Sequence, residues 1–309
     1  MPLPITPPLL PQLAKSRSTL PEDDGWAFEP KWDGFRCIAF VDGDEWYLQS
    51  RNGKPLLRYF PEISFPKGRY VLDGEIVPDN DSFNTLGQRI HPAESRIARL
   101  AEETPTHFVA FDILAFEDEV LMDLPFEQRR ALLEKLPKEI ELTPHVRSAA
   151  EAERWLHTGE GVVAKELACP YLPGERKGMA KIKRMRTLDA VVVGWRPGKH
   201  EGTVGSLILG LYDKQGKLHV VGHTSGFKAS EKRELVAKLE PYETGERGAG
   251  DPSRWRPDHE LEWITLRPEL VVEVTFDHVS DGRIRHGTKV QRWREDKPPA
   301  ECKLEQLDS

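Results

Sequence analysis

From residue 187 onward the chain consists mostly of short strand patterns, and this limits its fold more than any other feature. Four segments rich in β-branched residues are separated by turns that contain Gly, Asp or Lys: "LDAVVVGW" from 188, "SLILGLY" from 206, "KLHVVGH" from 217 and "ELVVEVTFD" from 269. One convincing helix pattern interrupts them, from Ser230 to Leu239, and Pro241 stops it. Many short strands with a single helix indicate a small β-barrel, with an OB-fold as the leading candidate.

The first 187 residues combine strand and helix patterns. Strands are expected at 35–41, 45–49, 70–77 and 107–114, and in "GVVAKEL" from 161 and "MAKIKRM" from 179. One helix is expected from Pro125 to just before Pro137. Another is expected after Ser148, which forms a capping-box pattern with Glu151, and should end near Gly159.

These patterns predict two domains in an α+β chain. The boundaries are 1–187 for the mixed domain and 188–309 for the barrel. Within the barrel, the glycine-rich and charged stretch 243–255 is expected to be a mobile loop.

Composition excludes several classes of protein. The chain has 309 residues, of which 38% are hydrophobic and 31% charged, and its apolar runs are too short to cross a bilayer. The proline-rich start lacks the features of a signal peptide. Cys37, Cys169 and Cys302 lie far apart without CxxC spacing, which argues against a zinc site or a disulfide framework. We therefore expect a cytoplasmic protein without a membrane partner.

Basic residues are concentrated in two stretches, although the net charge is −7. Six Lys or Arg lie between 181 and 199, and six more lie between 283 and 297. Such stretches are typical either of solvated strand faces or of a surface that binds nucleic-acid phosphates.

The stretch "EPKWDGFRCIAF", residues 29–40, places a charged pair before an apolar strand. In an extended segment Lys31 and Asp33 would share one face, because side chains alternate along a strand. Gly34 would permit a bend or the close approach of another group. On these residues alone, the pair is either a solvated loop or the entrance to a site.

Further short motifs follow "KWDG" along the chain, and together they resemble those of a known family. After "KWDG" come "SRNG" at 50, "LDGEIV" at 72, "FVAFDIL" at 108, "EGVVAKE" at 160, "KIKR" at 181 and "RWREDK" at 292. In this order they resemble the motifs of the nucleotidyltransferase superfamily of ATP-dependent DNA ligases, mRNA capping enzymes and RNA ligases. The opening motif looks most like the small bacterial C-type DNA ligases, with the ligase module of the D-type enzymes next. The resemblance implies a nucleotidyltransferase (ATP-grasp-like ligase) domain of antiparallel sheets and helices, followed by an OB-fold.

The resemblance also implies a catalytic lysine. Lys31 would be the nucleophile that takes AMP from ATP, which requires the neutral amine, and neighbouring cations and a divalent metal favour that form. Lys181 and Lys183, expected on one face of a strand, would hold the α-phosphate. Without the surrounding motifs, a solvated edge strand would be the ordinary interpretation of these two lysines.

The remaining site residues come from the same resemblance. They are Glu29 for the adenine amino group, Phe111 for stacking on adenine, Arg36 and Glu75 for the ribose, Arg51 near the 5′-phosphate of the nick, Arg176 for a phosphate or the nucleotide, and Arg294, Asp296 and Lys297 for the pyrophosphate. Glu160 and Glu75, both expected in apolar strands, would hold Mg²⁺ or Mn²⁺. Structural salt bridges are the alternative for the two glutamates, and a core position is the alternative for Phe111.

The resulting hypothesis is a DNA ligase that seals nicks in duplex DNA through lysyl-AMP and DNA-adenylate intermediates. We expect a monomer that acts in repair at the nucleoid, beside a repair polymerase or an end-binding protein. An RNA ligase, a capping-type nucleotidyltransferase and a non-catalytic nicked-DNA binder stay open as alternatives. Retention of Lys31 and the other site residues argues against the last, because binding alone needs no nucleophile.

Overall fold

The computed structural model describes residues 2–79, 86–250, 261–277, 279–280, 282–284 and 288–307. The chain divides into two compact units, Met1–Arg184 and Met185–Ser309, whereas the sequence placed a division after residue 187. Within the described residues, no helix has the length and apolar character needed to span a membrane.

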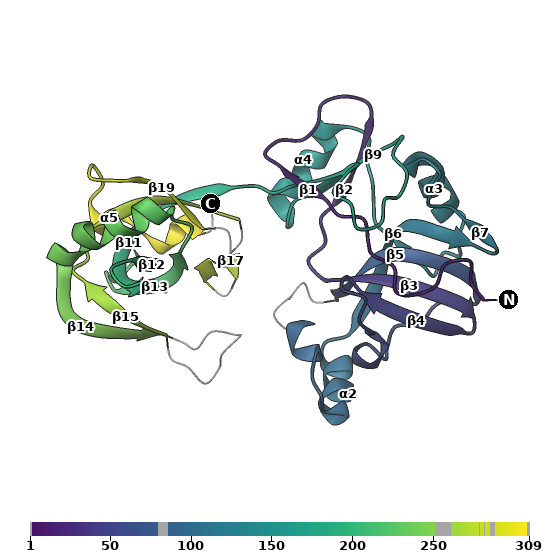
Figure 1. Cartoon of the computed structure of the whole chain (residues 1–309), viewed down its shortest axis with the longest axis horizontal. Coiled ribbons are helices and arrows are strands. Elements are labelled where there is room, and N and C mark those ends of the chain that lie inside the picture. Colours follow the sequence, from purple (N-terminus) through teal and green to yellow (C-terminus); the bar gives the residue numbers. More distant parts are fainter. Residues whose placement is uncertain are drawn as a thin grey trace. The chain divides into compact units, whose positions relative to one another are not determined.

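The larger sheet of the first unit has six strands, of which five follow the order β4-β3-β5-β6-β7 (Figure 1). The sixth strand, β8, pairs with β6. All neighbours along this path are antiparallel, and only the β6–β8 pair is parallel. The strands are β3 (Phe35–Gly43), β4 (Glu45–Ser50), β5 (Gly68–Pro78), β6 (Thr106–Phe116), β7 (Glu119–Val120) and β8 (Glu141–Leu142). They confirm the four strands predicted between 35 and 114. Cys37 and Ala39 pack in one apolar cluster and Ile38 and Phe40 in another, so both faces of β3 are buried.

The smaller sheet of the first unit has the order β1-β10-β9-β2. Its strands are β1 (Lys15–Arg17), β2 (Trp26–Pro30), β9 (Val162–Glu166) and β10 (Met179–Ile182), of which β1 and β10 are parallel. Successive side chains of β9 and β10 point to opposite faces of this sheet. Val162 and Ile182 pack with Ala152 of helix α4 (Ala149–Thr158), whereas Val163 and Lys181 point to the other face. The smaller sheet therefore has one apolar face and one face available for chemistry.

Two further helices belong to this unit, α2 (Glu94–Glu103) and α3 (Phe126–Leu133), together with the short 3₁₀ helices η1 (Leu57–Tyr59) and η2 (Gly87–Arg89). Helix α3, which packs against β6, confirms the helix predicted after Pro125. Helix α4 confirms the helix predicted after Ser148, but the capping box is wrong because the Ser148 side chain makes no capping hydrogen bond. The backbone N–H of Ala152 donates to the Ser148 carbonyl instead, and burial of Ala152 anchors this first turn.

The second unit is built around the long strand β11 (Arg186–Pro197), which pairs with β12, β15 and β16 along its length. A strand with three partners makes the sheet curl around one apolar core. The other strands are β12 (Val204–Tyr212), β13 (Leu218–Thr224), β14 (Glu243–Gly250), β15 (Leu261–Leu266), β16 (Val271–Phe276), β17 (Val279–Ser280), β18 (Arg283–Ile284) and β19 (Lys289–Trp293). Helix α5 (Ala229–Leu239) confirms the predicted helix, and η3 (Glu240–Tyr242), η4 (Pro299–Glu301) and η5 (Leu304–Leu307) complete the unit.

The predicted loop at 243–255 is wrong over its first half. Residues 243–250 form β14, which pairs with β15, and the register shifts between Glu243 and Arg247. Gly245, which lies within this shift, has a φ of 82°. The glycine therefore allows an irregularity within the strand and does not mark a loop. Gly248 lies against the indole of Trp263, where a Cβ would be 2.2 Å from the indole nitrogen. Residues 251–255 lie outside the described residues.

Candidate active site

A pocket of about 220 Å³ opens between the two sheets of the first unit. Strands β2, β9 and β10 contribute side chains from one side, and β3, β5 and β6 contribute them from the other. Eight residues that the sequence singled out line it together: Glu29, Lys31, Arg36, Arg51, Glu75, Phe111, Arg176 and Lys181. The pocket thus combines cations, carboxylates and an aromatic ring from positions far apart in the sequence.

Lys31 lies in the short connection between β2 and β3. The expectation of a shared extended face with Asp33 is wrong, because residues 31–34 are outside both strands, and Lys31 lines the pocket. Its backbone N–H donates to the Gly161 carbonyl at 2.9 Å, and its Nζ donates to the Trp32 carbonyl at 3.3 Å. The expected close approach at Gly34 is confirmed, since a Cβ there would lie 2.2 Å from the carbonyl oxygen of Ile76 in β5.

Positive charge is concentrated around Lys181. Burial is the largest cause that lowers the pKa of this lysine, and the charges of four neighbours add to it: Lys183, Lys31, Arg51 and Arg176. Because β10 ends at Ile182, the prediction that Lys181 and Lys183 share a strand face is wrong. Lys183 instead places its Nζ 3.7 Å from Glu160. A cluster of cations at one end of a pocket is suited to an anionic group such as a phosphate.

Glu160 precedes β9 rather than lying in a strand, which corrects the sequence expectation. The following residue, Gly161, has a φ of 127°, and a Cβ there would lie 2.2 Å from the carbonyl oxygen of Ile182. Glycine is therefore needed for the turn between α4 and β9. This turn brings the Glu160–Lys183 pair next to the backbone of Lys31.

Glu75 projects into the pocket from β5, opposite Arg36 of β3 in the strand register. Burial raises the pKa of its carboxyl group to about 7, and the nearby charges of Arg36 and Lys31 only partly oppose this effect. A carboxyl group that titrates near neutrality can accept or donate a hydrogen bond, as a hydroxyl-bearing ligand requires.

Phe111 enters the pocket at an irregularity in β6. The register shifts there, because Gly74 pairs with Ala110 and Asp73 pairs with Asp112, so Phe111 is the extra residue. The Arg36 guanidinium lies 4.6 Å from the centre of its ring. Burial alone would lower the pKa of Arg36, but Asp73 outweighs it and raises that pKa through two hydrogen bonds of 2.6 Å. The Lys165 Nζ also lies 4.6 Å from the ring centre, and Phe111 is 7% exposed, so the ring lines the pocket while most of it packs in the interior.

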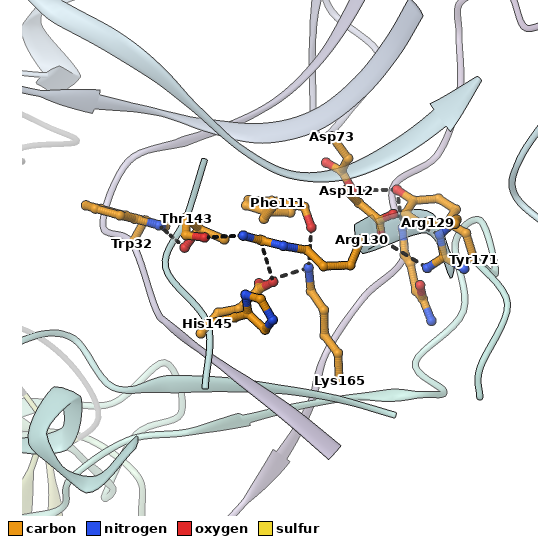
Figure 2. A network of polar contacts seen from close by, with 12 residues as sticks. Trp32, Asp73, Phe111, Asp112, Arg129, Arg130, Thr143, His145, Lys165 and Tyr171 are labelled. Carbon is orange, nitrogen blue, oxygen red and sulfur yellow. Dashed lines mark hydrogen bonds and ion pairs between the residues drawn. The ribbon is translucent and has the colours of Figure 1, made fainter. Parts of the chain in front are cut away.

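The wall beside Glu29 carries a buried polar network (Figure 2). Lys165 places its Nζ 2.9 Å from Glu29 Oε2 and donates to the Phe111 carbonyl at 2.9 Å. Arg130 lies 3.8 Å from Glu29 Oε1, an oxygen that is buried and has no hydrogen-bond partner. Burial raises the pKa of Glu29, and Lys165 is the main opposing influence. The network leaves Glu29 Oε1 ion-paired with Arg130 but without a hydrogen bond.

Sequence reasoning missed Lys165, Trp32 and Asp73. A lysine inside "GVVAKEL" was the available signal for Lys165, because an unpaired charge in an apolar strand is costly. Trp32 lines the pocket and donates from its indole to Thr143 at 2.9 Å, a partner that lies 111 residues away.

Comparison with known proteins places this pocket in a family. A family model described as "ATP dependent DNA ligase domain" matches residues 8–183, and one described as "ATP dependent DNA ligase C terminal region" matches residues 200–297. The chain belongs to the ATP-dependent DNA ligase family.

Curated relatives of this ligase extend over the whole chain. DNA ligase C1 of Mycolicibacterium smegmatis is 44% identical over 336 residues, which cover 100% of this chain and 96% of the relative. DNA ligase C of Mycobacterium tuberculosis is 41% identical over 347 residues, with 100% and 96% covered. The predicted resemblance to the small bacterial C-type enzymes is thereby confirmed.

A solved structure supports the same fold. Mycobacterial DNA ligase D, "complexed with ATP and MES", superposes with a TM-score of 0.51 at 28% identity, covering 95% of this chain and 97% of that one. The predicted fold class, a nucleotidyltransferase domain followed by an OB-fold, is confirmed. The ligase activity predicted from the motif series agrees with these relatives.

The last motif of the ligase lies in its second unit, where its cations are paired with carboxylates. Arg294 donates to both oxygens of Asp189, at 2.8 and 3.0 Å, and to Asp296 at 2.9 and 2.8 Å. Lys297 lies 3.8 Å from Asp189 and 3.4 Å from Glu301. Asp189 therefore balances two of the cations that the sequence assigned to the pyrophosphate.

The carboxylates of the ligase are compatible with a weakly held divalent metal. Among the described residues, no three or more His, Cys, Asp or Glu side chains form a group that could hold an ion. Glu75 lines the pocket and Glu160 is only 14% exposed beside Lys183. One or two carboxylates fit Mg²⁺ or Mn²⁺, because such ions keep phosphate and water oxygens in their shell.

Proposed function

We propose that this ligase seals nicks in duplex DNA through a covalent AMP intermediate on Lys31. The observation that carries the proposal is the pocket, which brings Lys31 together with Lys181 and Phe111. A nucleophile, a phosphate-binding cation and a surface for a base are the three parts that adenylyl transfer needs.

In the first step, the neutral amine of Lys31 attacks the α-phosphorus of ATP. A P–N bond forms, the bond to the β-phosphate oxygen breaks, pyrophosphate leaves and the amine loses a proton. Lys181 and Lys183 hold the charge that develops on the α-phosphate, while Arg294, Asp296 and Lys297 orient the pyrophosphate. A divalent cation held by Glu160 and Glu75, together with phosphate oxygens, would supply further positive charge.

The nucleoside is held by the opposite end of the pocket. Phe111 stacks on the adenine, and the unpartnered oxygen of Glu29 accepts a hydrogen bond from the adenine amino group. Arg36 and Glu75 bind the ribose hydroxyl groups, and Arg176 contacts a phosphate or the nucleotide. A buried acceptor that lacks a hydrogen bond gains most from a ligand that donates to it, which favours ATP over GTP.

The second and third steps act on DNA. AMP passes from Lys31 to the 5′-phosphate of the nick, with Arg51 near that phosphate. The adjacent 3′-hydroxyl then attacks the phosphorus, forms the phosphodiester bond and releases AMP. The free energy of the ATP anhydride is thus carried through two intermediates to the sealed strand.

The first test uses ATP labelled with ³²P at the α-phosphate. The protein is incubated with Mg²⁺ or Mn²⁺ and run on a denaturing gel, with α-labelled GTP and Lys31→Ala as controls. We expect an acid-labile label from ATP alone, absent from Lys31→Ala. The variant should still seal a supplied pre-adenylylated nick, because the first step has been bypassed.

The chase identifies the polynucleotide. Transfer of label to nicked DNA but not to nicked RNA supports the proposal, and the reverse would establish an RNA ligase. Label from GTP would establish a capping-type enzyme. Folded, nucleotide-free protein that takes label from neither nucleotide would leave a nicked-DNA binder as the function.

We also propose that the ligase works as a monomer in DNA repair at the nucleoid, beside a repair polymerase or an end-binding protein. The repair role is supported by a relative from M. smegmatis named "Multifunctional non-homologous end joining protein LigD", which is 32% identical over 89% of this chain but only 37% of its own length. Reduced nick repair in cells that lack the partner would support this role, whereas unchanged repair would contradict it.

A further inference from the structure

One wall of the pocket comes from the beginning of the chain. Residues 8–17, here called the strap, contribute Pro11, Leu13 and Ala14 to the pocket lining. The strap ends in β1, where Ser16 lies opposite Lys181 of β10. The strap therefore places its backbone against the strand that carries the phosphate-binding lysine.

The strap is fastened to the rest of the unit at several points. Leu9 exchanges two hydrogen bonds with the side chain of Gln49, at 2.8 and 2.6 Å. The Leu13 N–H donates to the Glu175 carbonyl at 2.8 Å. Gln12 is only 3% exposed, and its side chain donates to the Lys177 carbonyl at 2.6 Å. These bonds fix the backbone on both sides of the residues that line the pocket.

The hydroxyl group of Tyr171 is one of two links between this strap and the nucleotide end of the pocket, the other being a direct hydrogen bond from Arg36 to the Gln12 carbonyl. The Tyr171 hydroxyl accepts from the Gln12 N–H at 3.1 Å and donates to Asp73 Oδ2 at 2.6 Å. Tyr171 is 3% exposed and Asp73 is fully buried. Figure 2 shows the Tyr171 and Asp73 side chains within the same polar network.

Asp73 in turn fixes Arg36. Both carboxylate oxygens of Asp73 accept from the Arg36 guanidinium, which lies over the Phe111 ring and also donates to the Gln12 carbonyl at 3.3 Å. The contacts form a closed loop that runs through Gln12, Tyr171, Asp73 and Arg36. Closed hydrogen-bond networks hold their members in one arrangement.

We propose that Tyr171 is a positioning residue for nucleotide binding, because it couples the strap to Arg36. This inference rests on the proposed function, in which Arg36 and Phe111 bind the nucleoside of ATP. Tyr171 itself does not line the pocket and acts through Asp73 and Gln12. Its loss should weaken ATP binding and leave the chemistry at Lys31 unchanged.

The test is Tyr171→Phe in the full chain, compared with Tyr70→Phe as a matched control. Tyr70 is equally buried, and its hydroxyl donates to the Pro66 carbonyl away from the pocket. Lys31 adenylylation is measured over a range of ATP concentrations. We expect KM for ATP to rise about tenfold in Tyr171→Phe, with kcat within about twofold of wild type. Tyr70→Phe should leave both parameters unchanged.

A second variant keeps the test decisive if Tyr171→Phe fails to fold. Gln12→Ala removes the strap bond to Lys177 and should raise KM for ATP in the same direction, with kcat unchanged. Equal KM values in the Tyr171, Gln12 and Tyr70 variants would overturn the inference, as would an effect confined to kcat. Absence of adenylylation in wild type would instead contradict the proposed function, so the two failures are distinguishable.

Discussion

At the residue scale, the surroundings of the Glu75 carboxyl group shift its pKa in opposite directions. Burial between the sheets raises its pKa to about 7, while Arg36 and Lys31 favour the ionised form. The folded protein therefore binds a proton at Glu75 more tightly than the unfolded chain does, whose glutamate titrates near 4.5. The contribution of Glu75 to the unfolding free energy is fully present below pH 4.5. It is lost as the pH rises through 7, where the folded protein also releases the proton.

Glu75→Gln should remove this part of the pH dependence of stability. Without nucleotide, we expect the wild-type unfolding free energy to lose on the order of 3 kcal/mol through Glu75 between pH 4.5 and 8. Urea unfolding of both proteins at several pH values measures the difference. The control is Glu45→Gln, an exposed glutamate in β4. An identical pH profile in wild type and Glu75→Gln would contradict the prediction.

Lys165 illustrates the cost of separating a buried ion pair. Lys165 and Glu29 are both 3% exposed, so Lys165→Met leaves a buried carboxylate whose remaining cation is Arg130, 3.8 Å away and without a hydrogen bond to it. We expect a loss of about 3–5 kcal/mol of unfolding free energy. The exposed pair of Lys67 and Asp44, 71% and 75% exposed, provides the control, and Lys67→Met should cost less than about 1 kcal/mol.

Urea denaturation of the two methionine variants at the same pH is the measurement. Similar losses in both would show that burial does not decide the strength of the Lys165–Glu29 pair. Restoration of stability by a second change, Glu29→Gln, would confirm that the unpaired carboxylate is the cause.

At the element scale, the turn between α4 and β9 sets the place of Lys31. A methyl group at Gly161 would collide with the Ile182 carbonyl oxygen, and the φ of 127° disfavours any side chain. The Gly161 carbonyl also accepts the Lys31 N–H, so a shift of this turn moves the nucleophile.

Gly161→Ala should therefore slow adenylylation of Lys31 by about 100-fold, since a displacement of about 1 Å has effects of this size. Gly159→Ala is the matched control, because its Cβ would meet only the Trp155 carbonyl oxygen at 3.5 Å, an ordinary contact. Single-turnover adenylylation of both variants at saturating ATP measures the effect. Equal rates in the two variants would exclude a role of this turn in placing Lys31.

Elements with strong local patterns could be predicted, and elements fixed by distant partners could not. The central strands follow their β-branched and aromatic content, and helices α3, α4 and α5 follow the proline, serine and glycine signals at their ends. Strand β1 lies in a polar, proline-flanked segment and exists only because it pairs with β10, about 165 residues away. Strand β14 was not predicted because its glycines are typical of a loop. Gly245 lies in a register shift and Gly248 packs against Trp263.

The residues of the candidate site also differ in whether a local pattern or a distant partner determines their role. The motif series predicted eight of the residues that line the pocket, because each motif carries its own local pattern. It did not predict Asp73, Lys165 and Tyr171, whose importance arises from partners brought together by the fold. Lys183 and Glu160 were assigned to strands that end, or begin, one or two residues away.

At the scale of the whole molecule, the proposed substrate, nicked DNA, has the same sign of charge as the chain. The net charge is −7, so binding has to come from local basic stretches such as residues 181–199. Residue Arg285 of the second stretch lies outside the described residues. If about six phosphates are neutralised, affinity for nicked DNA should fall about 10³-fold between 50 and 200 mM salt.

Fluorescence anisotropy with a labelled nicked duplex at a series of salt concentrations measures this slope. Arg184→Gln, within the first stretch, should make the logarithmic slope shallower by about one, while Lys214→Gln in the β12–β13 turn should leave it unchanged. A slope near zero in wild type would contradict phosphate binding by the basic stretches.

The strap also affects how the protein is made. Its Gln12 leaves the ribosome early, but its partner carbonyl at Lys177 is 165 residues further along the chain. At roughly 5–20 residues per second, translation separates the two by about 8–33 seconds. During that interval the nascent chain carries Lys31 on an unfinished pocket. A ribosome that pauses before residue 177 has also not yet made β10, which carries Lys181, so its nascent chain should not be adenylylated, and release of the pause should restore labelling.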